Sequence, residues 1–268
     1  MDLSRSRVVV SVAMTAIGLG TVLTASACGI DLGLPLNVRE DGLREQTAVT
    51  EVKVAGDSGN VTVIGDNTVG VDVRRTVHYA DGHEPGQTMS VSGTTLTVNT
   101  DCGDRCSASY EVHVAKGVRV SGSTDSGNVS LSGVSDVDVR VDSGTIRVDG
   151  ATGNVSAEAN SGNVELADIA GTVKANADSG NITGRNLRGT SLTFDAQSGN
   201  IDVSAPGAGN ITARADSGNV TLRVPDNCCR VTADADSGNE EVRVGTNANS
   251  QYLIDARASS GNVTVRAL

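Results

Sequence analysis

The sequence predicts an all-β fold, a single-stranded β-solenoid (β-helix) with rungs of roughly 18 residues and two short strands each. Three observations favour this fold class. A ten-residue box recurs along the chain, apolar and polar residues alternate inside each box, and the chain has no Trp and one Phe. A repeat this short cannot bury its own apolar face, whereas repeats stacked about 4.8 Å apart can do so with small side chains.

The first 27 residues predict a lipoprotein signal peptide and are set aside before the fold is considered. Arg5 and Arg7 precede an apolar run, and the small residues Ala-Ser-Ala stand directly before Cys28. Cys28 is therefore the predicted lipidation site, where acyl chains such as palmitate would anchor the chain to a membrane. An ordinary signal peptide or a buried helix is the alternative. We expect an exported protein on the outer face of the bacterial cytoplasmic membrane.

The remaining chain divides into a tether and a repetitive part. Residues 28–47 contain scattered Gly, Pro and mixed charges and are expected to be the tether. Residues 48–268 are expected to form the solenoid, with regular repeats over 120–268. Residues 48–119 contain longer strands and are expected to form wider rungs at its N-terminal end. A separate small β domain is the alternative for this segment.

The box begins at Val52 as VKVAGDSGNV and returns eight times between Val120 and Val263. Its apolar-x-small-x-small pattern predicts a strand with one buried face. Asp-Ser-Gly-Asn predicts a turn, because Asp and Ser bond to nearby backbone groups and Gly tolerates positive φ. One residue of each turn is expected to stack into an asparagine ladder: Asn128, Asn163, Asn181, Asn200, Asn219, Asn239 and Asn262.

These DSGN[VI] boxes, recurring at this spacing after a membrane anchor, resemble the bacterial putative-adhesin domain of unknown function. The resemblance covers about residues 48–268. It implies a β-solenoid without known catalytic residues. It also implies a role at the cell surface.

Composition and motifs argue against several function classes. The net charge of −11 disfavours binding to nucleic acid or docking of the protein surface on anionic lipid. The sequence has no GxSxG, HExxH or phosphate-binding loop. We expect no enzyme and no cofactor; a polysaccharide-active β-helix enzyme is the remote alternative.

Five cysteines are present, and four remain once Cys28 is assigned to lipid. In an oxidising compartment an even set favours disulfides. Cys102 and Cys106 can close a small loop, and Cys228 can bond to its neighbour Cys229 with some strain. A zinc site made from all four thiolates is the alternative.

Two groups of residues suggest metal binding, and both have a simpler interpretation. His78 and His83 flank a loop that contains Asp81 and Glu84, although such loop residues are usually solvated. The box aspartates suggest calcium, but with one acid per turn they are expected to cap their turns instead. They are Asp57, Asp125, Asp142, Asp178, Asp216 and Asp236. We expect no metal site.

The pattern favours a non-catalytic binding module of the cell envelope. Its partner is expected to be a cell-surface glycan or an exported protein, and the scarcity of aromatic residues counts against tight sugar binding. A structural or regulatory scaffold is the alternative. The rung ending at residues 265–268 has no polar cap, so association of two copies through that end is a further hypothesis.

Overall fold

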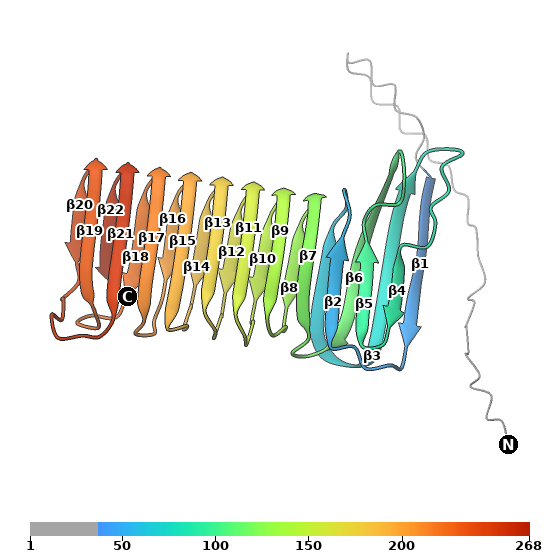
Figure 1. Cartoon of the computed structure of the whole chain (residues 1–268), viewed down its shortest axis with the longest axis horizontal. Coiled ribbons are helices and arrows are strands. Elements are labelled where there is room, and N and C mark those ends of the chain that lie inside the picture. The colour runs from blue at the N-terminus through green and yellow to red at the C-terminus, as the bar shows by residue number, and fades with distance from the viewer. Residues whose placement is uncertain (1–36) are drawn as a thin grey trace, which may run out of the picture. The chain divides into compact units, whose positions relative to one another are not determined.

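The computed structural model describes residues 37–268, so the predicted signal peptide and Cys28 lie outside the described residues. The all-β prediction is confirmed: the described residues form two eleven-stranded, largely parallel sheets and contain no helix (Figure 1). Consequently no helix in residues 37–268 could cross a membrane.

Consecutive strands alternate between the two sheets over most of the chain. Sheet A contains β1 (Asn37–Glu45), β3 (Val61–Tyr79), β6 (Cys106–Ala115), β8 (Val129–Ser132), β10 (Ile146–Asp149), β12 (Val164–Ala167), β14 (Ile182–Arg185), β16 (Ile201–Ser204), β18 (Val220–Val224), β20 (Glu240–Arg243) and β22 (Val263–Ala267). Sheet B contains β2 (Glu51–Ala55), β4 (Met89–Ser92), β5 (Thr95–Asn99), β7 (Arg119–Ser126), β9 (Val137–Ser143), β11 (Val155–Ser161), β13 (Val173–Ser179), β15 (Ser191–Ser198), β17 (Asn210–Ser217), β19 (Arg230–Ser237) and β21 (Leu253–Ser260).

One strand of sheet B and the following strand of sheet A form a rung, and rungs stack in parallel register. In β11 and β13, Val155 lies opposite Val173, and Val164 of β12 lies opposite Ile182 of β14. The inward side chains are mostly Val, Ile and Ala, and the single Phe, Phe194, is fully buried. Sheet B turns many alanines inward, which is consistent with a thin core that holds few aromatic rings.

The Asp-Ser-Gly-Asn turns place backbone directly against backbone. Gly144 has φ +142°, and a Cβ there would lie 2.0 Å from the carbonyl oxygen of Gly127 in the preceding rung. Gly218 repeats this, with φ +147° and a distance of 2.0 Å to the Gly199 oxygen. No side chain fits in that space, so the glycine of the box is required by stacking as well as by φ.

The expected asparagine ladder is present, but its main bonds run from backbone to side chain. The backbone N–H of Asn200 donates to Oδ1 of Asn181, and that of Asn219 donates to Oδ1 of Asn200, both at 2.9 Å. Side-chain amides also donate along the ladder at both steps, at 3.1 Å. The asparagines therefore satisfy backbone donors at the turn, where a regular sheet hydrogen bond is missing.

The last two rungs exchange places relative to chain order. β21 pairs with β17 on one side and with β19 on the other, and β22 lies between β18 and β20 (Figure 1). The rung of β19 and β20 therefore forms the end of the stack, and the C-terminal rung lies inside it. The prediction that residues 265–268 close the stack is wrong.

Glu240 explains why β20 lies at the end. It occupies the position where the box otherwise has Val or Ile, and its partner in β22 is the fully buried Val263. In the interior, a carboxylate there would be buried without a counter-charge. At the end it accepts a hydrogen bond from the Ala235 N–H at 3.0 Å. In interior rungs, backbone N–H groups donate hydrogen bonds to carbonyl oxygens of the following rung, as the Val155 N–H does to Thr172 O.

The N-terminal region adds antiparallel strands to both sheets. β3 pairs with β8 through its first four residues. It pairs with β6 in antiparallel register along both of its halves, and with β1 through residues 71–79. β4 and β5 form a hairpin that pairs with β2. β1 lies within the segment expected to be the tether. It forms a strand because it aligns with β3 over Asn37–Glu45 and packs Leu43 against the core.

Candidate functional site

A row of arginines crosses the outward face of sheet A toward the C-terminal end of the stack. The register aligns Ser204 with Arg223, Arg223 with Arg266, and Arg266 with Arg243. Arg185 continues the row one strand before Ser204, because Gly184 lies opposite Val203. We call Arg185, Ser204, Arg223, Arg266 and Arg243, in this spatial order, the arginine row. It concentrates positive charge on a chain whose net charge is −11.

Only half of these arginines are neutralised by neighbours. Arg223 donates to the carboxylate of Asp202, and Arg243 forms an ion pair with Glu241. Arg185 and Arg266 make no ion pair or side-chain hydrogen bond within residues 37–268. Both side chains are exposed, so their donors are free for a ligand.

A shallow recess of about 500 Å³ lies at the start of the arginine row. Long side chains surround it: Arg147, Glu165, Arg185 and Arg223. It is hollow because the strands between them present small residues, among them Ala167 and Ser204. The recess is open and bordered by charged side chains, which suits an elongated polar ligand better than an enclosed apolar one.

Sequence reasoning missed the arginine row, although a signal was present. In four boxes an arginine follows the turn asparagine by four residues: SGNITGR, SGNVTLR, SGNEEVR and SGNVTVR. Other boxes have Ile, Ser, Asp or Ala at that position. The spacing places all four arginines on one face only once the register and the rung exchange are known.

The outward face of sheet B carries the box aspartates in one column. Asp57, Asp125 and Asp142 lie on neighbouring rungs, and beyond Asp142 acidic and neutral residues alternate. From Asp142 onward the spatial order is Asp142, Asn160, Asp178, Gln197, Asp216, Ser259 and Asp236. Asn160 donates to Asp142 at 2.9 Å, and Gln197 donates to Asp178 at 3.1 Å. From Asp142 onward this alternation keeps like charges off adjacent strands, where they would destabilise the sheet. It depends on the rung exchange, which puts Ser259 between Asp216 and Asp236.

This column corrects the expected role of the box aspartates. Within residues 37–268 none of the six box aspartate side chains accepts a hydrogen bond from a backbone N–H of its turn, so turn capping is not their role. No three His, Cys, Asp or Glu side chains in this part of the chain converge as metal ligands.

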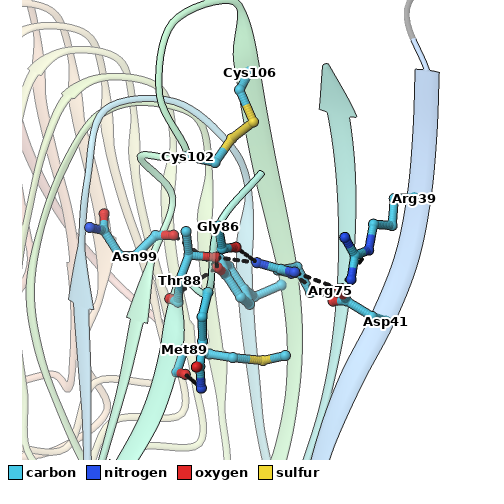
Figure 2. Close-up of polar contacts among 11 residues, drawn as sticks. Arg39, Asp41, Arg75, Gly86, Thr88, Met89, Asn99, Cys102 and Cys106 are labelled. Atoms are coloured by element: carbon cyan, nitrogen blue, oxygen red, sulfur yellow. Dashed lines mark hydrogen bonds and ion pairs between the residues drawn. A yellow bond between two sulfur atoms is a disulfide. The ribbon is translucent and has the colours of Figure 1, made fainter. Parts of the chain in front are cut away.

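A buried polar network joins β1 to the rest of the N-terminal region (Figure 2). The Arg75 side chain is 4% exposed and donates to both carboxylate oxygens of Asp41 in β1. It also donates to Gly86 O at 2.8 Å and Thr88 Oγ1 at 2.7 Å. The bond to Asp41 raises the pKa of Arg75, while burial raises the pKa of Tyr110, which donates to Asn99 O at 2.8 Å. The guanidinium is fully enclosed, so the network serves structure.

His113 is part of a second, more exposed cluster. Its Nδ1 lies 2.8 Å from Asp66 Oδ2, and its Nε2 lies 3.3 Å from Glu111 Oε1. The bond to Asp66 raises the pKa of His113, and hydrogen bonds from Thr68 and His113 lower the pKa of Asp66 to about 2.

The other predicted residues lie apart from one another. Cys102 is bonded to Cys106 between β5 and β6, and Cys228 to Cys229 between β18 and β19, so the two pairs belong to opposite ends of the stack (Figures 1 and 2). Asp81 accepts from Asn37 Nδ2 at 2.7 Å, and His83 Nδ1 lies 3.0 Å from the Asp81 carbonyl oxygen.

These features define a repetitive two-sheet β protein with a polar outer face. The chain belongs to the Toastrack DUF4097 family, whose model matches residues 45–266. The resemblance to a bacterial domain of unknown function is thereby confirmed. Among proteins with curated functions, none matches the chain significantly.

Several crystal structures show limited similarity to this chain. A putative adhesin from Bacteroides fragilis NCTC 9343 is 14% identical with a TM-score of 0.48, covering 90% of this chain and 100% of its own. A putative adhesin from Parabacteroides merdae ATCC 43184 is 14% identical with a TM-score of 0.36, covering 87% and 96%. A putative lipid binding protein from Parabacteroides distasonis ATCC 8503 is 12% identical with a TM-score of 0.34, covering 87% and 96%. Likeness at this level carries no functional argument.

Proposed function

We propose that this protein is an adhesin-like, non-catalytic binding module of the bacterial cell envelope, built as a β-solenoid and held on the outer face of the cytoplasmic membrane by lipid on Cys28. The observation that carries the proposal is the outward face of sheet A. There the repeat presents an open recess bordered by charged side chains and a row of partly unpaired arginines, on a stack that is otherwise acidic. Membership of a family of repetitive β domains supports it.

The stack itself is suited to binding extended partners. Its side chains repeat at the spacing of adjacent strands, about 4.8 Å, so one face offers the same chemistry several times in a line. A cell-surface glycan presents repeated groups in the same way. The other candidate partner is an exported protein, for which the acidic outward face of sheet B offers complementarity to a basic surface.

Anchoring is tested with the full chain in a bacterial host. The wild-type chain should incorporate labelled palmitate and fractionate with membranes. Cys28→Ser should lose the label, and Cys102→Ser should keep it. Equal labelling of wild-type and Cys28→Ser chains would overturn the proposed anchor.

Binding is tested by incubating purified residues 29–268 with cell wall polysaccharide freed of protein and, separately, with exported proteins of the native host. Sedimentation with the polysaccharide, reversed by soluble glycan, supports a glycan-binding module. Retention of one exported protein without polysaccharide binding supports the scaffold alternative. Failure to retain either overturns the binding-module proposal.

A further inference from the structure

We propose that the arginine row is the ligand-binding site of this module and that its ligand is an acidic polysaccharide, lying across the strands along the row. This inference rests on the proposed binding function and adds the site and the chemical class of the ligand. It starts from three properties of the row: free cations, regular spacing and neighbouring hydroxyl groups.

The unpaired arginines indicate that the ligand is negatively charged. Arg185 and Arg266 have exposed guanidinium groups without acidic partners in residues 37–268, while Arg223 and Arg243 are paired with Asp202 and Glu241. Guanidinium groups bind carboxylates through two parallel hydrogen bonds. The row contains no acidic residue, so a carboxylate above Ser204 would lie between the cations of Arg185 and Arg223.

The spacing determines that the ligand is extended. Successive members of the row are on adjacent strands, ~4.8 Å apart, so Arg223, Arg266 and Arg243 repeat at about the length of one sugar unit in an extended polysaccharide. A ligand with one charge per sugar, or one per two sugars, can therefore meet several arginines at once. Such repeated contacts give avidity even when each alone is weak.

Hydroxyl groups beside the arginines favour a sugar over a purely ionic polymer. Thr183, Thr221 and Thr264 are outward residues of the neighbouring row, at the positions that face Asp202 and Glu241 along the sheet. They can exchange hydrogen bonds with sugar hydroxyls while the arginines hold the carboxylates. Affinity then comes from charge and hydrogen bonds, which is consistent with a chain that has three Tyr, one Phe and no Trp.

The outward face of sheet B differs from that of sheet A in charge, and this difference restricts the proposed site to sheet A. Two arginines of sheet B in the last rungs are paired with an acid: Arg214 and Arg257 both form ion pairs with Asp255. Asp178, Asp216 and Asp236 add negative charge beside them. An acidic polysaccharide is therefore repelled from sheet B and attracted to sheet A.

The test measures binding of purified residues 29–268 to polygalacturonate by calorimetry at low salt. The double variant Arg185→Ser/Arg266→Ser removes the two free cations without breaking an ion pair. Arg119→Ser/Arg230→Ser is the matched control, because both residues are exposed, without an ion pair in the described residues, and on sheet B. We expect at least a tenfold loss of affinity in the first variant and less than twofold in the second. Arg185→Lys/Arg266→Lys should restore part of the affinity, and dextran should not bind.

Equal losses in both double variants would show a general charge effect and overturn the site. Binding of inorganic polyphosphate but not polygalacturonate would overturn the ligand class. If cell wall polysaccharide or an exported protein binds while polygalacturonate does not, the binding module stands and this inference fails. Circular dichroism of each variant must match the wild type, and the lysine variant keeps the test valid if the serine variant folds poorly.

Discussion

The interior rungs and the end rung share one sequence box but differ in what they turn inward. Interior positions such as Val164, Ile182 and Val220 are fully buried, whereas the end rung has Glu240 at the corresponding place and leaves Val242 44% exposed. The difference teaches that the place of a rung in the stack, and not its place in the chain, sets its composition. A carboxylate and a half-exposed apolar strand are tolerated where no further rung follows, and the inward charge discourages other strands from adding there.

The largest expected effect comes from moving the end-rung charge into the interior. Val220→Glu should lower the free energy of unfolding by about 5 kcal/mol or more, because it buries a carboxylate without a partner. Glu240→Val should change stability by less than about 1 kcal/mol. Urea unfolding followed by circular dichroism measures both. A small effect of Val220→Glu would contradict the stated difference between interior and end.

The same Glu240→Val variant tests what the charge does at the end. Without it the edge strands β19 and β20 are apolar on their inward side and can pair with another copy. We expect concentration-dependent dimers in sedimentation velocity, where the wild type stays monomeric. Glu241→Val, on the outward side, is the control and should remain monomeric.

Truncation of an inward side chain should also lower the free energy of unfolding much more in the interior rungs than in the end rung. Phe194→Ala removes the largest fully buried side chain and should cost about 3–5 kcal/mol, because the closely packed sheets cannot collapse around the space. Val242→Ala in the end rung should cost under about 1 kcal/mol. The ratio of the two losses in urea unfolding is the readout, and a ratio near one would contradict the account.

Turn glycines offer a smaller comparison of the same kind. Gly144→Ala places a Cβ 2.0 Å from Gly127 O at φ +142°, and should cost about 2–3 kcal/mol. Gly238→Ala meets Gly261 O at 1.9 Å, but the end rung can shift outward because nothing follows it. Its effect on the melting temperature should be less than half as large.

The smallest expected effect on stability is the pH dependence that comes from the exposed cluster of His113, outside the regular rungs. Its raised pKa contributes stability that is present below the ordinary histidine value and lost as pH rises through the folded value. The lowered pKa of Asp66 contributes above pH 3.8 and is lost as pH falls toward about 2. Asp66→Asn should lower the pKa of His113 in an NMR titration. Asp138→Asn on sheet B should leave it unchanged, and a His113 pKa unaffected by Asp66→Asn would contradict the assigned cause.

The repeat could be predicted from the sequence because its signals are local. The alternation within the box predicts strands, the Asp-Ser-Gly-Asn turn explains the glycine and asparagine columns, and the missing aromatics fit thin sheets. Two residues in the sequence are related to the rung exchange: Glu240 stands where other boxes have Val or Ile, and Ser259 stands where most boxes have Asp. Neither has a meaning until the neighbours in space are known.

The sites were harder to predict because they join distant residues. Asp41 and Arg75 are 34 positions apart and belong to no box. No sequence pattern therefore predicts their pairing. The arginine row has a visible spacing, four residues after the turn asparagine. However, the spacing only predicts a face once parallel register aligns the strands.

The rung exchange is tested most directly by hydrogen exchange of backbone amides, because exchange reports which strands lie inside the stack. We expect amides of β21 and β22 to exchange as slowly as those of β17 and β18, and those of β19 and β20 to exchange much faster. The opposite order, with protected β19 and β20 and rapidly exchanging β21 and β22, would show that the rungs stack in chain order and that Glu240 is an interior residue.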